Sequence, residues 1–171
     1  DAVNAICDHK DIKAISFVGS THVGTHVYNR ASLNGKRVQC MMGAKNHAIV
    51  LPDANKEQTL NAIAGAAFGA AGQRCMALPV VMLVGEAQQW LPDLIAKAKT
   101  LKISGGNEPG TDVGPVISCS ALSRIEGLIE RGIADGAKLV LDGRKPSVPG
   151  YEKGNFVGPT IFSGVKPGMS V

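Results

Sequence analysis

The sequence predicts an α/β fold built on an open, mostly parallel sheet. Short runs of β-branched and apolar residues alternate along the chain with longer segments of helical spacing, an order typical of parallel strands joined by crossover helices. Glycine accounts for 21 of the 171 residues, which indicates many tight turns. Apolar residues make up 44% and charged residues 19%, so the chain is able to bury a packed core.

The first predicted elements form a strand–helix–strand unit. Residues 12–18 are rich in apolar side chains and predict a buried strand. Ser20 is a suitable N-cap for a helix that runs to about Ser32, just before the stop signal at residues 34–35. Residues 37–41 predict the strand that follows this helix.

The rest of the chain continues the same alternation. Residues 48–51 predict a strand, and the turn at residues 52–55 opens a long helix whose apolar positions extend to Phe68. A loop rich in glycine and proline is expected at residues 143–154. The other expected elements are helices at residues 87–99 and 121–135 and strands at residues 80–84, 138–141 and 159–162.

Charge and composition exclude several classes of function. The net charge of +4 is spread over scattered residues, which argues against a nucleic-acid partner. The four cysteines lie more than thirty residues apart without zinc-ligand spacing, so no metal site is expected and reduced thiols are the natural interpretation. No stretch approaches the ~18–20 apolar residues of a membrane span, which excludes a membrane-spanning helix.

The first motif with chemical meaning runs from Phe17 to Gly24. A strand leads into the turn at Gly19, and Ser20 then opens a helix. Backbone N–H groups at a helix start, together with the positive end of the helix dipole, suit a pyrophosphate. The same junction is also common as an ordinary turn between a strand and a helix, so the motif alone leaves both interpretations open.

The second motif is the glycine-rich run from Phe68 to Cys75. Small residues leave open space around one thiol, so a substrate can approach it closely. Arg74 is its immediate neighbour and is able to favour the thiolate or bind a substrate carboxylate. A buried structural cysteine beside a surface arginine is the alternative. His47 follows a third motif, residues 41–46, and is interpreted as a structural residue rather than a base for Cys75.

Taken in order, four motifs resemble the aldehyde dehydrogenase superfamily across essentially the whole chain. They are residues 17–20, 42–46, 72–75 and 158–160. Within that superfamily, residues 43–47 and 69–77 are most similar to the CoA-acylating methylmalonate-semialdehyde dehydrogenases.

The resemblance implies an internal fragment of a three-layer αβα protein. Residues 1–43 would be the C-terminal part of a Rossmann-like NAD-binding domain, and residues 44–171 the N-terminal part of the catalytic domain, both incomplete. The resemblance implies that Cys75 is the catalytic nucleophile and that Arg74 holds the substrate carboxylate. The residues that it implies for the NAD site are Phe17, Gly19, Ser20, Gly24 and Gly43. The oxyanion-binding Asn of the family lies upstream of this segment, and Asn46 is not expected to replace it.

Met41 departs from the pattern of the superfamily. Most members carry a Glu here, which activates the hydrolytic water, and a thioether cannot take a proton from water. The resemblance therefore implies coenzyme A as the acyl acceptor. It implies oxidative decarboxylation of methylmalonate or malonate semialdehyde to propionyl-CoA or acetyl-CoA through a thioester on Cys75, with NAD as oxidant, a reaction of valine degradation.

Two alternatives remain beside this hypothesis. One is a hydrolytic aldehyde dehydrogenase, and the other is a truncated, non-catalytic fragment that binds nucleotide or a partner subunit. Residues 1–171 alone are expected to lack dehydrogenase activity. For the full-length parent, the resemblance implies a homotetramer that is cytoplasmic in bacteria or located in the mitochondrial matrix of eukaryotes.

Overall fold

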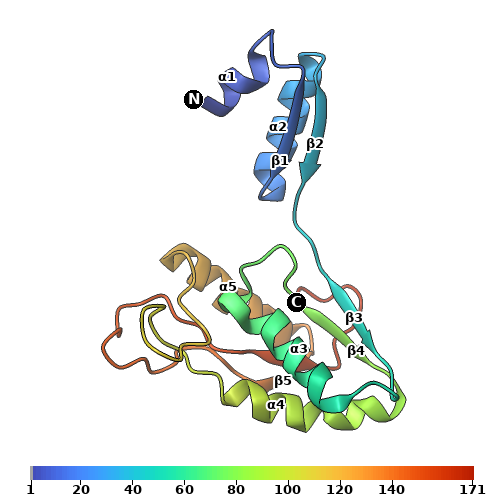
Figure 1. Cartoon of the computed structure of the whole chain (residues 1–171), viewed down its shortest axis with the longest axis vertical. Coiled ribbons are helices and arrows are strands. Elements are labelled where there is room, and N and C mark those ends of the chain that lie inside the picture. The colour runs from blue at the N-terminus through green and yellow to red at the C-terminus, as the bar shows by residue number, and fades with distance from the viewer. Residues whose placement is uncertain (1) are drawn as a thin grey trace. The chain divides into compact units, whose positions relative to one another are not determined.

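The computed structural model describes residues 2–171, which divide into two compact units, residues 2–45 and residues 46–171 (Figure 1). Strands and helices alternate in both units, which confirms the predicted α/β class. The assignment of residues 1–43 to a cofactor domain and residues 44–171 to a catalytic domain stays a prediction.

The first unit contains a parallel strand–helix–strand motif. Its elements are α1 (Ala2–Asp8), β1 (Ala14–Val18), α2 (Thr21–Leu33) and β2 (Arg37–Met41). The two strands pair in parallel from Ala14 with Arg37 to Val18 with Met41, so their carboxyl ends lie side by side. Helix α2 connects them and packs on one face of the pair (Figure 1).

Alternating side chains form the core of this unit. Cys7, Val27 and Ala31 are buried, and alternate residues of β1 and β2 pack against them. Helix α1 is held to α2 by Asp8, whose carboxylate oxygens accept hydrogen bonds from Arg30 at 2.8 and 2.6 Å. The sequence patterns did not predict α1.

The second unit begins with another parallel pair. Its first elements are β3 (His47–Val50), α3 (Lys56–Phe68) and β4 (Val80–Leu83), and the strands pair from His47 with Val80 to Val50 with Leu83. Asn55 caps α3, as the turn at residues 52–55 predicts, by accepting a hydrogen bond from the Gln58 N–H at 3.0 Å.

Two helical segments replace the single helix expected at residues 87–99. A 3₁₀ segment, η2 (Gly85–Trp90), precedes α4 (Leu91–Lys99). Pro92 explains the division: it lacks an N–H and cannot donate within a continuous α-helix, but it is tolerated in a first helical turn. Helices α3 and α4 contact each other over a core of buried residues, which are Val50, Leu60, Ile63, Ala87 and Leu94.

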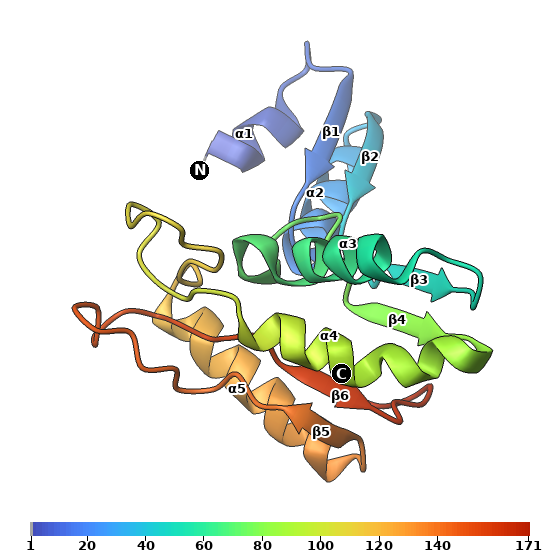
Figure 2. The ribbon, with the colours of Figure 1, turned by 60° about the horizontal axis from the view of Figure 1, so that its bottom comes forward.

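The last elements depart from the expected mostly parallel sheet. They are α5 (Cys119–Ala134), β5 (Lys138–Leu141) and β6 (Ile161–Ser163), and β5 and β6 pair antiparallel (Figure 2). In the described residues, the strands form three separate pairs rather than one open sheet. The antiparallel pair follows from its connection, which is a loop without the crossover helix that parallel strands use.

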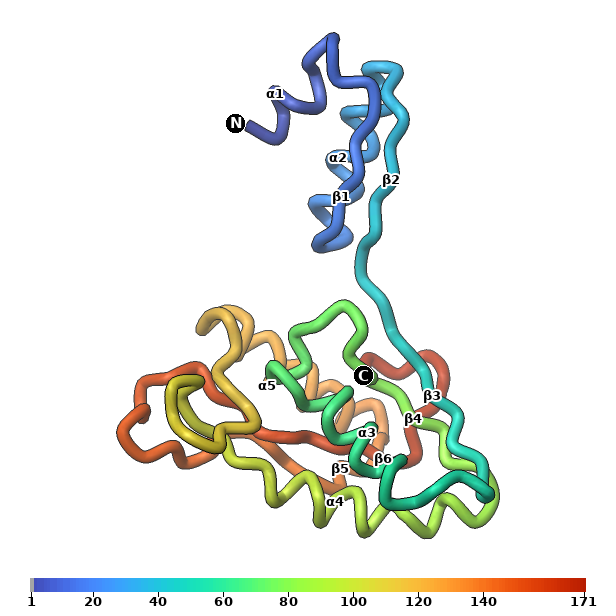
Figure 3. Tube along the Cα trace, viewed as in Figure 1, coloured from blue at the N-terminus to red at the C-terminus, as the bar shows by residue number. Residues whose placement is uncertain are grey.

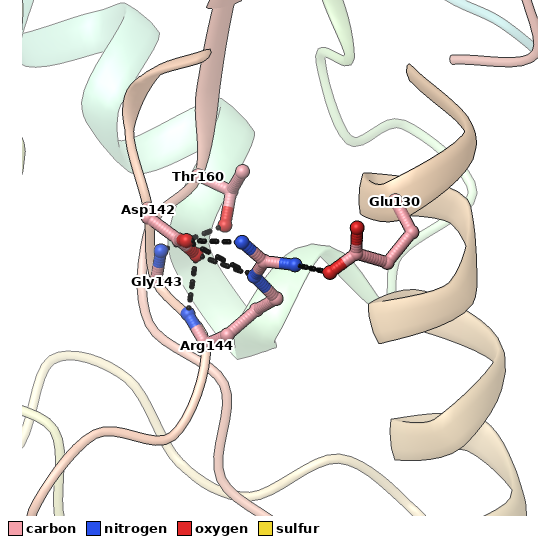
Figure 4. Close-up of polar contacts among 5 residues, drawn as sticks. All are labelled: Glu130, Asp142, Gly143, Arg144 and Thr160. Carbon is pink, nitrogen blue, oxygen red and sulfur yellow. Dashed lines mark hydrogen bonds and ion pairs between the residues drawn. The ribbon is translucent and has the colours of Figure 1, made fainter. Parts of the chain in front are cut away.

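Arg144 anchors that loop at its start (Figure 4). Its guanidinium forms ion pairs with Asp142 and with Glu130 of α5. The hydrogen bonds from Arg144 hold the pKa of the Asp142 carboxyl below its ordinary value. At Gly143, a Cβ would overlap the backbone carbonyl of Gly158, so glycine is needed for the two chain segments to approach each other.

Candidate functional site

The five residues predicted to bind NAD gather where β1 and β2 end. The Gly19 N–H donates to the Met41 carbonyl at 3.2 Å and extends the pairing one residue beyond β1. Ser20 caps α2, because its hydroxyl accepts from the Val23 N–H at 3.4 Å. The Gly43 N–H donates to the Thr21 hydroxyl at 3.3 Å, which brings the chain after β2 onto the start of α2.

At two of these positions, glycine leaves room for a neighbouring side chain. A Cβ on Gly19 would lie 2.6 Å from the ring of Phe17. A Cβ on Gly24 would lie 2.6 Å from the Met42 side chain and 3.3 Å from the same ring. The Phe17 ring therefore packs over glycine backbone at the start of α2, and Met42 lies beside it.

This arrangement has the features of a nucleotide site. In open α/β sheets, ligands bind beyond the carboxyl ends of parallel strands, and a helix start offers N–H groups and positive dipole to a phosphate. The turn at Gly19 and the N-terminal end of the 13-residue α2 provide both here. The Gly19 N–H already donates to Met41, so an anion at this turn would face the start of α2, and its use for NAD remains a proposal.

The Cys75 loop follows α3 through a strained turn. Ala70, Ala71 and Gly72 have φ angles of 52°, 53° and 72° in succession. The left-handed region costs a non-glycine residue roughly 1–2 kcal/mol, so the two alanines carry strain that the rest of the unit must offset. Such strain is frequent where a segment is held for function. Figure 3 traces this loop between α3 and β4.

Two side-chain contacts hold the loop beside Cys75 while the Cys75 side chain remains exposed. Asn46, directly before β3, donates from its amide to the carbonyl oxygens of Cys75 at 2.9 Å and Ala77 at 2.7 Å. On the other flank, the Gln73 side chain accepts from the Ile117 N–H at 2.9 Å and donates to the Ala70 carbonyl at 3.0 Å. The loop is thus held by segments distant in sequence.

Arg74 points back to α3. Its guanidinium donates to the carbonyl oxygens of Gly65 and Ala66, in the last turn of the helix, where cations are favoured. A Cβ on Gly69 would lie 2.4 Å from the Arg74 Nη2, so this position of the side chain depends on glycine there. Arg74 adjoins Cys75 in sequence, and its predicted role as a carboxylate ligand stays a prediction.

The histidines give no metal site. Across residues 2–171, no group of three or more His, Cys, Asp or Glu side chains is arranged to hold a metal ion. His26 contacts the Asn4 side-chain oxygen at 2.8 Å and so links α2 to α1. Within the same residues, no helix has the length and apolar character needed to cross a membrane.

The contacts of Asn46 and Gln73 are the features that the sequence patterns missed. That Asn46 does not serve as the oxyanion donor stays a prediction; its amide nitrogen donates to two backbone carbonyls. The one available signal is its place two residues before the strand predicted at residues 48–51, where a polar side chain is able to reach a neighbouring loop. Two partners of the Gln73 side chain, the Pro115 carbonyl and the Ile117 N–H, lie 42 and 44 residues away and leave no local signal.

Comparison with known proteins gives one consistent result. The model of the aldehyde dehydrogenase family matches residues 1–171. The acylating methylmalonate-semialdehyde/malonate-semialdehyde dehydrogenase of human mitochondria is 61% identical over 170 residues, covering 99% of this chain and 32% of the relative. The corresponding rat enzyme gives the same identity and coverage. The chain therefore spans about a third of the length of the curated relatives that it matches.

Solved structures agree with the sequence matches. A methylmalonate-semialdehyde dehydrogenase from Oceanimonas doudoroffii has a TM-score of 0.93 at 44% identity, covering 98% of this chain and 35% of that one. A Sinorhizobium meliloti protein solved in complex with NAD has a TM-score of 0.92 at 47% identity with the same coverage. A betaine aldehyde dehydrogenase from Staphylococcus aureus in complex with NAD⁺ reaches 0.88 at 28% identity over 97% of this chain and 33% of that one.

Proposed function

The chain belongs to the aldehyde dehydrogenase family, and we propose that it is part of a longer polypeptide, here called the parent protein, that converts methylmalonate or malonate semialdehyde to propionyl-CoA or acetyl-CoA. In this proposal Cys75 is the nucleophile, NAD is the oxidant and coenzyme A is the second substrate. The names of the human and Oceanimonas relatives support the substrate class, and the word acylating in the human name supports coenzyme A.

The observation that carries the proposal is the state of Cys75 among the four cysteines. Cys7 is buried and Cys40 is half-buried, so neither thiol is open to a substrate. Cys119 is exposed, but its Sγ lies 3.0 Å from the side-chain oxygen of Asn155, to which it donates. Cys75 is exposed on a loop that is held by hydrogen bonds of the Asn46 and Gln73 side chains on its two flanks. An accessible nucleophile on a fixed backbone is what covalent catalysis needs.

The proposed chemistry at Cys75 has four steps. The thiolate adds to the aldehyde carbon and forms a thiohemiacetal, with the backbone N–H of Cys75 as one donor to the developing oxyanion. NAD, when bound, supplies the hydride acceptor for the oxidation. Cys75 then holds the acyl group as a thioester, and the substrate carboxylate leaves as CO₂. The electron pair of the broken C–C bond stays on the thioester as an enolate, which takes up a proton from solvent at its α-carbon. The thiol of coenzyme A attacks the thioester carbonyl and releases Cys75 as the leaving thiolate.

Met41 supports coenzyme A over water as acceptor. The resemblance to the family implies that Met41 stands where a water-activating carboxylate is expected, and a thioether has no proton affinity at neutral pH. Its Sδ lies 3.8 Å from the Gln39 amide nitrogen and provides only a weak acceptor. A thiol co-substrate needs no such base because it brings its own nucleophile.

Two sites of this chain would serve the remaining ligands. The turn at Gly19 and the start of α2 would receive the pyrophosphate of NAD, with Phe17, Ser20, Gly24 and Gly43 forming the surroundings. Arg74 would bind the substrate carboxylate, for which its guanidinium has to leave the carbonyls of α3.

The test uses the parent protein with methylmalonate semialdehyde and NAD, with and without coenzyme A. We expect rapid NADH formation and propionyl-CoA only when coenzyme A is present, and a fall in kcat of about 10³-fold or more in Cys75→Ser. Cys119→Ser is the matched control, because it replaces another exposed thiol and keeps a donor to Asn155. Vigorous turnover to a free acid without coenzyme A would establish the hydrolytic alternative instead.

Three further properties belong to the same proposal. The chain of residues 1–171 alone is expected to form no NADH, since it spans about a third of the curated relatives. The parent protein is proposed to assemble as a homotetramer, which its mass in solution would test. Its proposed compartment is the mitochondrial matrix if the source is eukaryotic, as the names of the human and rat relatives suggest, and the cytoplasm if it is bacterial.

A further inference from the structure

Asn46 occupies a place that ordinary strand pairing does not reach. Strand β3 begins at the next residue and pairs with β4 from Val80 onward. The Asn46 backbone already takes part, because its carbonyl accepts from the Val80 N–H at 3.2 Å. Leu78 is the next β4-side residue that would face β3 toward the Cys75 loop, but its N–H donates to the Ala66 carbonyl at 3.1 Å, so the parallel ladder ends at Val80.

Beyond the end of the β3–β4 hydrogen-bond ladder, the Asn46 side chain provides the next contacts with the segment before β4. Its amide nitrogen donates to the carbonyl oxygens of Ala77 at 2.7 Å and Cys75 at 2.9 Å. An Asn amide has two N–H donors, and two carbonyl acceptors lie within hydrogen-bond distance of its nitrogen. With its backbone and side chain together, one residue thus holds three points of the segment from Cys75 to Val80.

The loop needs such a contact because local structure alone does not define it. It follows the strained turn at Ala70 and Ala71, where relaxation to other backbone angles would be favourable. The carbonyl that Asn46 binds belongs to Cys75 itself, so any movement of this contact moves the Cα that carries the thiol.

We infer that Asn46 is a positioning residue for the Cys75 nucleophile, acting through the two backbone carbonyls that its amide binds. This inference rests on the proposed function, in which Cys75 attacks the substrate. Asn46 touches neither the thiol nor the reacting atoms in this role. The Asn46 amide fixes the position of the Cys75 thiol through the backbone. Because both amide hydrogens are bound to backbone carbonyls in this role, Asn46 does not also donate to an oxyanion.

The experiment compares Asn46→Asp and Asn46→Gln in the parent protein. Asn46→Asp keeps the shape of the side chain but removes both donors and turns an oxygen toward two carbonyls. Since a misplacement of about 1 Å can cost catalysis on the order of 100-fold, we expect kcat to fall about 10- to 100-fold while KM changes less than about twofold. Asn46→Gln keeps the two donors on a longer arm and should show an intermediate kcat.

A second readout reports on the thiol itself. The rate at which iodoacetamide alkylates Cys75, followed by mass spectrometry of the peptide, should change at least about threefold in Asn46→Asp. The matched control is Asn61→Asp on α3, which makes the same charge change at a residue whose side-chain oxygen accepts from Lys97. It should leave kcat and the alkylation rate as in the wild type.

The outcomes separate this inference from the proposed function. If Cys75→Ser keeps its activity, the proposed function fails. If Cys75→Ser is inactive but Asn46→Asp retains the wild-type kcat and alkylation rate, the positioning role alone is refuted. Should Asn46→Asp not fold, Asn46→Gln decides: a wild-type melting temperature with an altered kcat and alkylation rate supports the role, and wild-type values for all three overturn it.

Discussion

The two glycine-rich turns of this chain, at Gly19 and at Gly72, are held in different ways. At the first, a strand leads directly into a capped helix, and the glycines make room for Phe17 and Met42. At the second, the backbone turns through left-handed angles, and side chains from distant segments hold it. The first turn is defined within about 25 residues of sequence, whereas the second needs contacts that span 29 to 44 residues.

This difference suits the proposed roles. A pyrophosphate site needs backbone N–H groups in a fixed array, which a strand–helix junction provides from local structure. A nucleophile needs one side chain presented at a defined point with open space around it. A loop held through its backbone carbonyls gives that result, because the contacts do not cover the thiol.

The largest expected effect compares two helical glycines. Gly24→Ala in α2 places a Cβ 2.6 Å from Met42, whereas Gly65→Ala in α3 meets open space. Both gain helix propensity, but only Gly24→Ala overpacks, so we expect it to be less stable than Gly65→Ala by about 1–3 kcal/mol. Urea unfolding measures the difference, and NAD titration should show weaker binding for Gly24→Ala only. Equal free energies of unfolding would refute the space requirement at the first turn.

The strain of the second turn predicts opposite effects at neighbouring positions. Gly72→Ala puts a Cβ at a φ of 72° and should lower the free energy of unfolding by about 1–2 kcal/mol. Ala71→Gly removes that penalty at a φ of 53°. It should raise the free energy of unfolding by up to about 1 kcal/mol, after the greater entropy of an unfolded glycine is counted. Chemical denaturation of both variants provides the measurement, and equal signs would contradict a left-handed turn.

Gly69→Ala tests the two roles open to Arg74. The added Cβ would displace its guanidinium from the carbonyls of α3, without backbone strain because the φ of Gly69 is −54°. If Arg74 binds the substrate carboxylate, loss of the competing contact should lower KM for methylmalonate semialdehyde by about 2- to 5-fold. Propanal, which has no carboxylate, should show no change. An equal change for both aldehydes would instead make Arg74 a helix cap that steadies the loop.

The sequence predicted those elements whose position depends on residues close together in the chain. The strand at residues 37–41 and the Ser20 cap are confirmed with their expected residues, since strand composition and N-cap chemistry act over a few positions. Helix α1 was missed because it spans only seven residues, fewer than a window in which helical periodicity can be recognised. The contacts of Asn46 were missed because they join residues that only the folded chain brings together.

The smallest expected effect concerns the antiparallel region, which lies outside both turns. Because Arg144 lowers the pKa of Asp142 from its ordinary value of 3.8, the folded state favours the carboxylate. That stabilisation is fully present above the unfolded pKa and is lost as pH falls through the folded one. The effect is small, since 39% of the Asp142 side chain is exposed and water screens the pair.

The free energy of unfolding of the wild type should therefore decrease as pH falls from about 5 to below 3.8. Arg144→Gln should show a smaller decrease over the same pH range. Arg124→Gln, which removes an exposed cation from the same α5 helix that carries Glu130, is the control and should keep the wild-type slope. Cys75 alkylation at neutral pH should not change in Arg144→Gln, because the ion pairs of Arg144 join only α5 and the loop after β5. A changed rate of Cys75 alkylation in Arg144→Gln would mean that the β5–β6 region also supports the Cys75 loop. The comparison of the two turns would then have to include this third region of the fold.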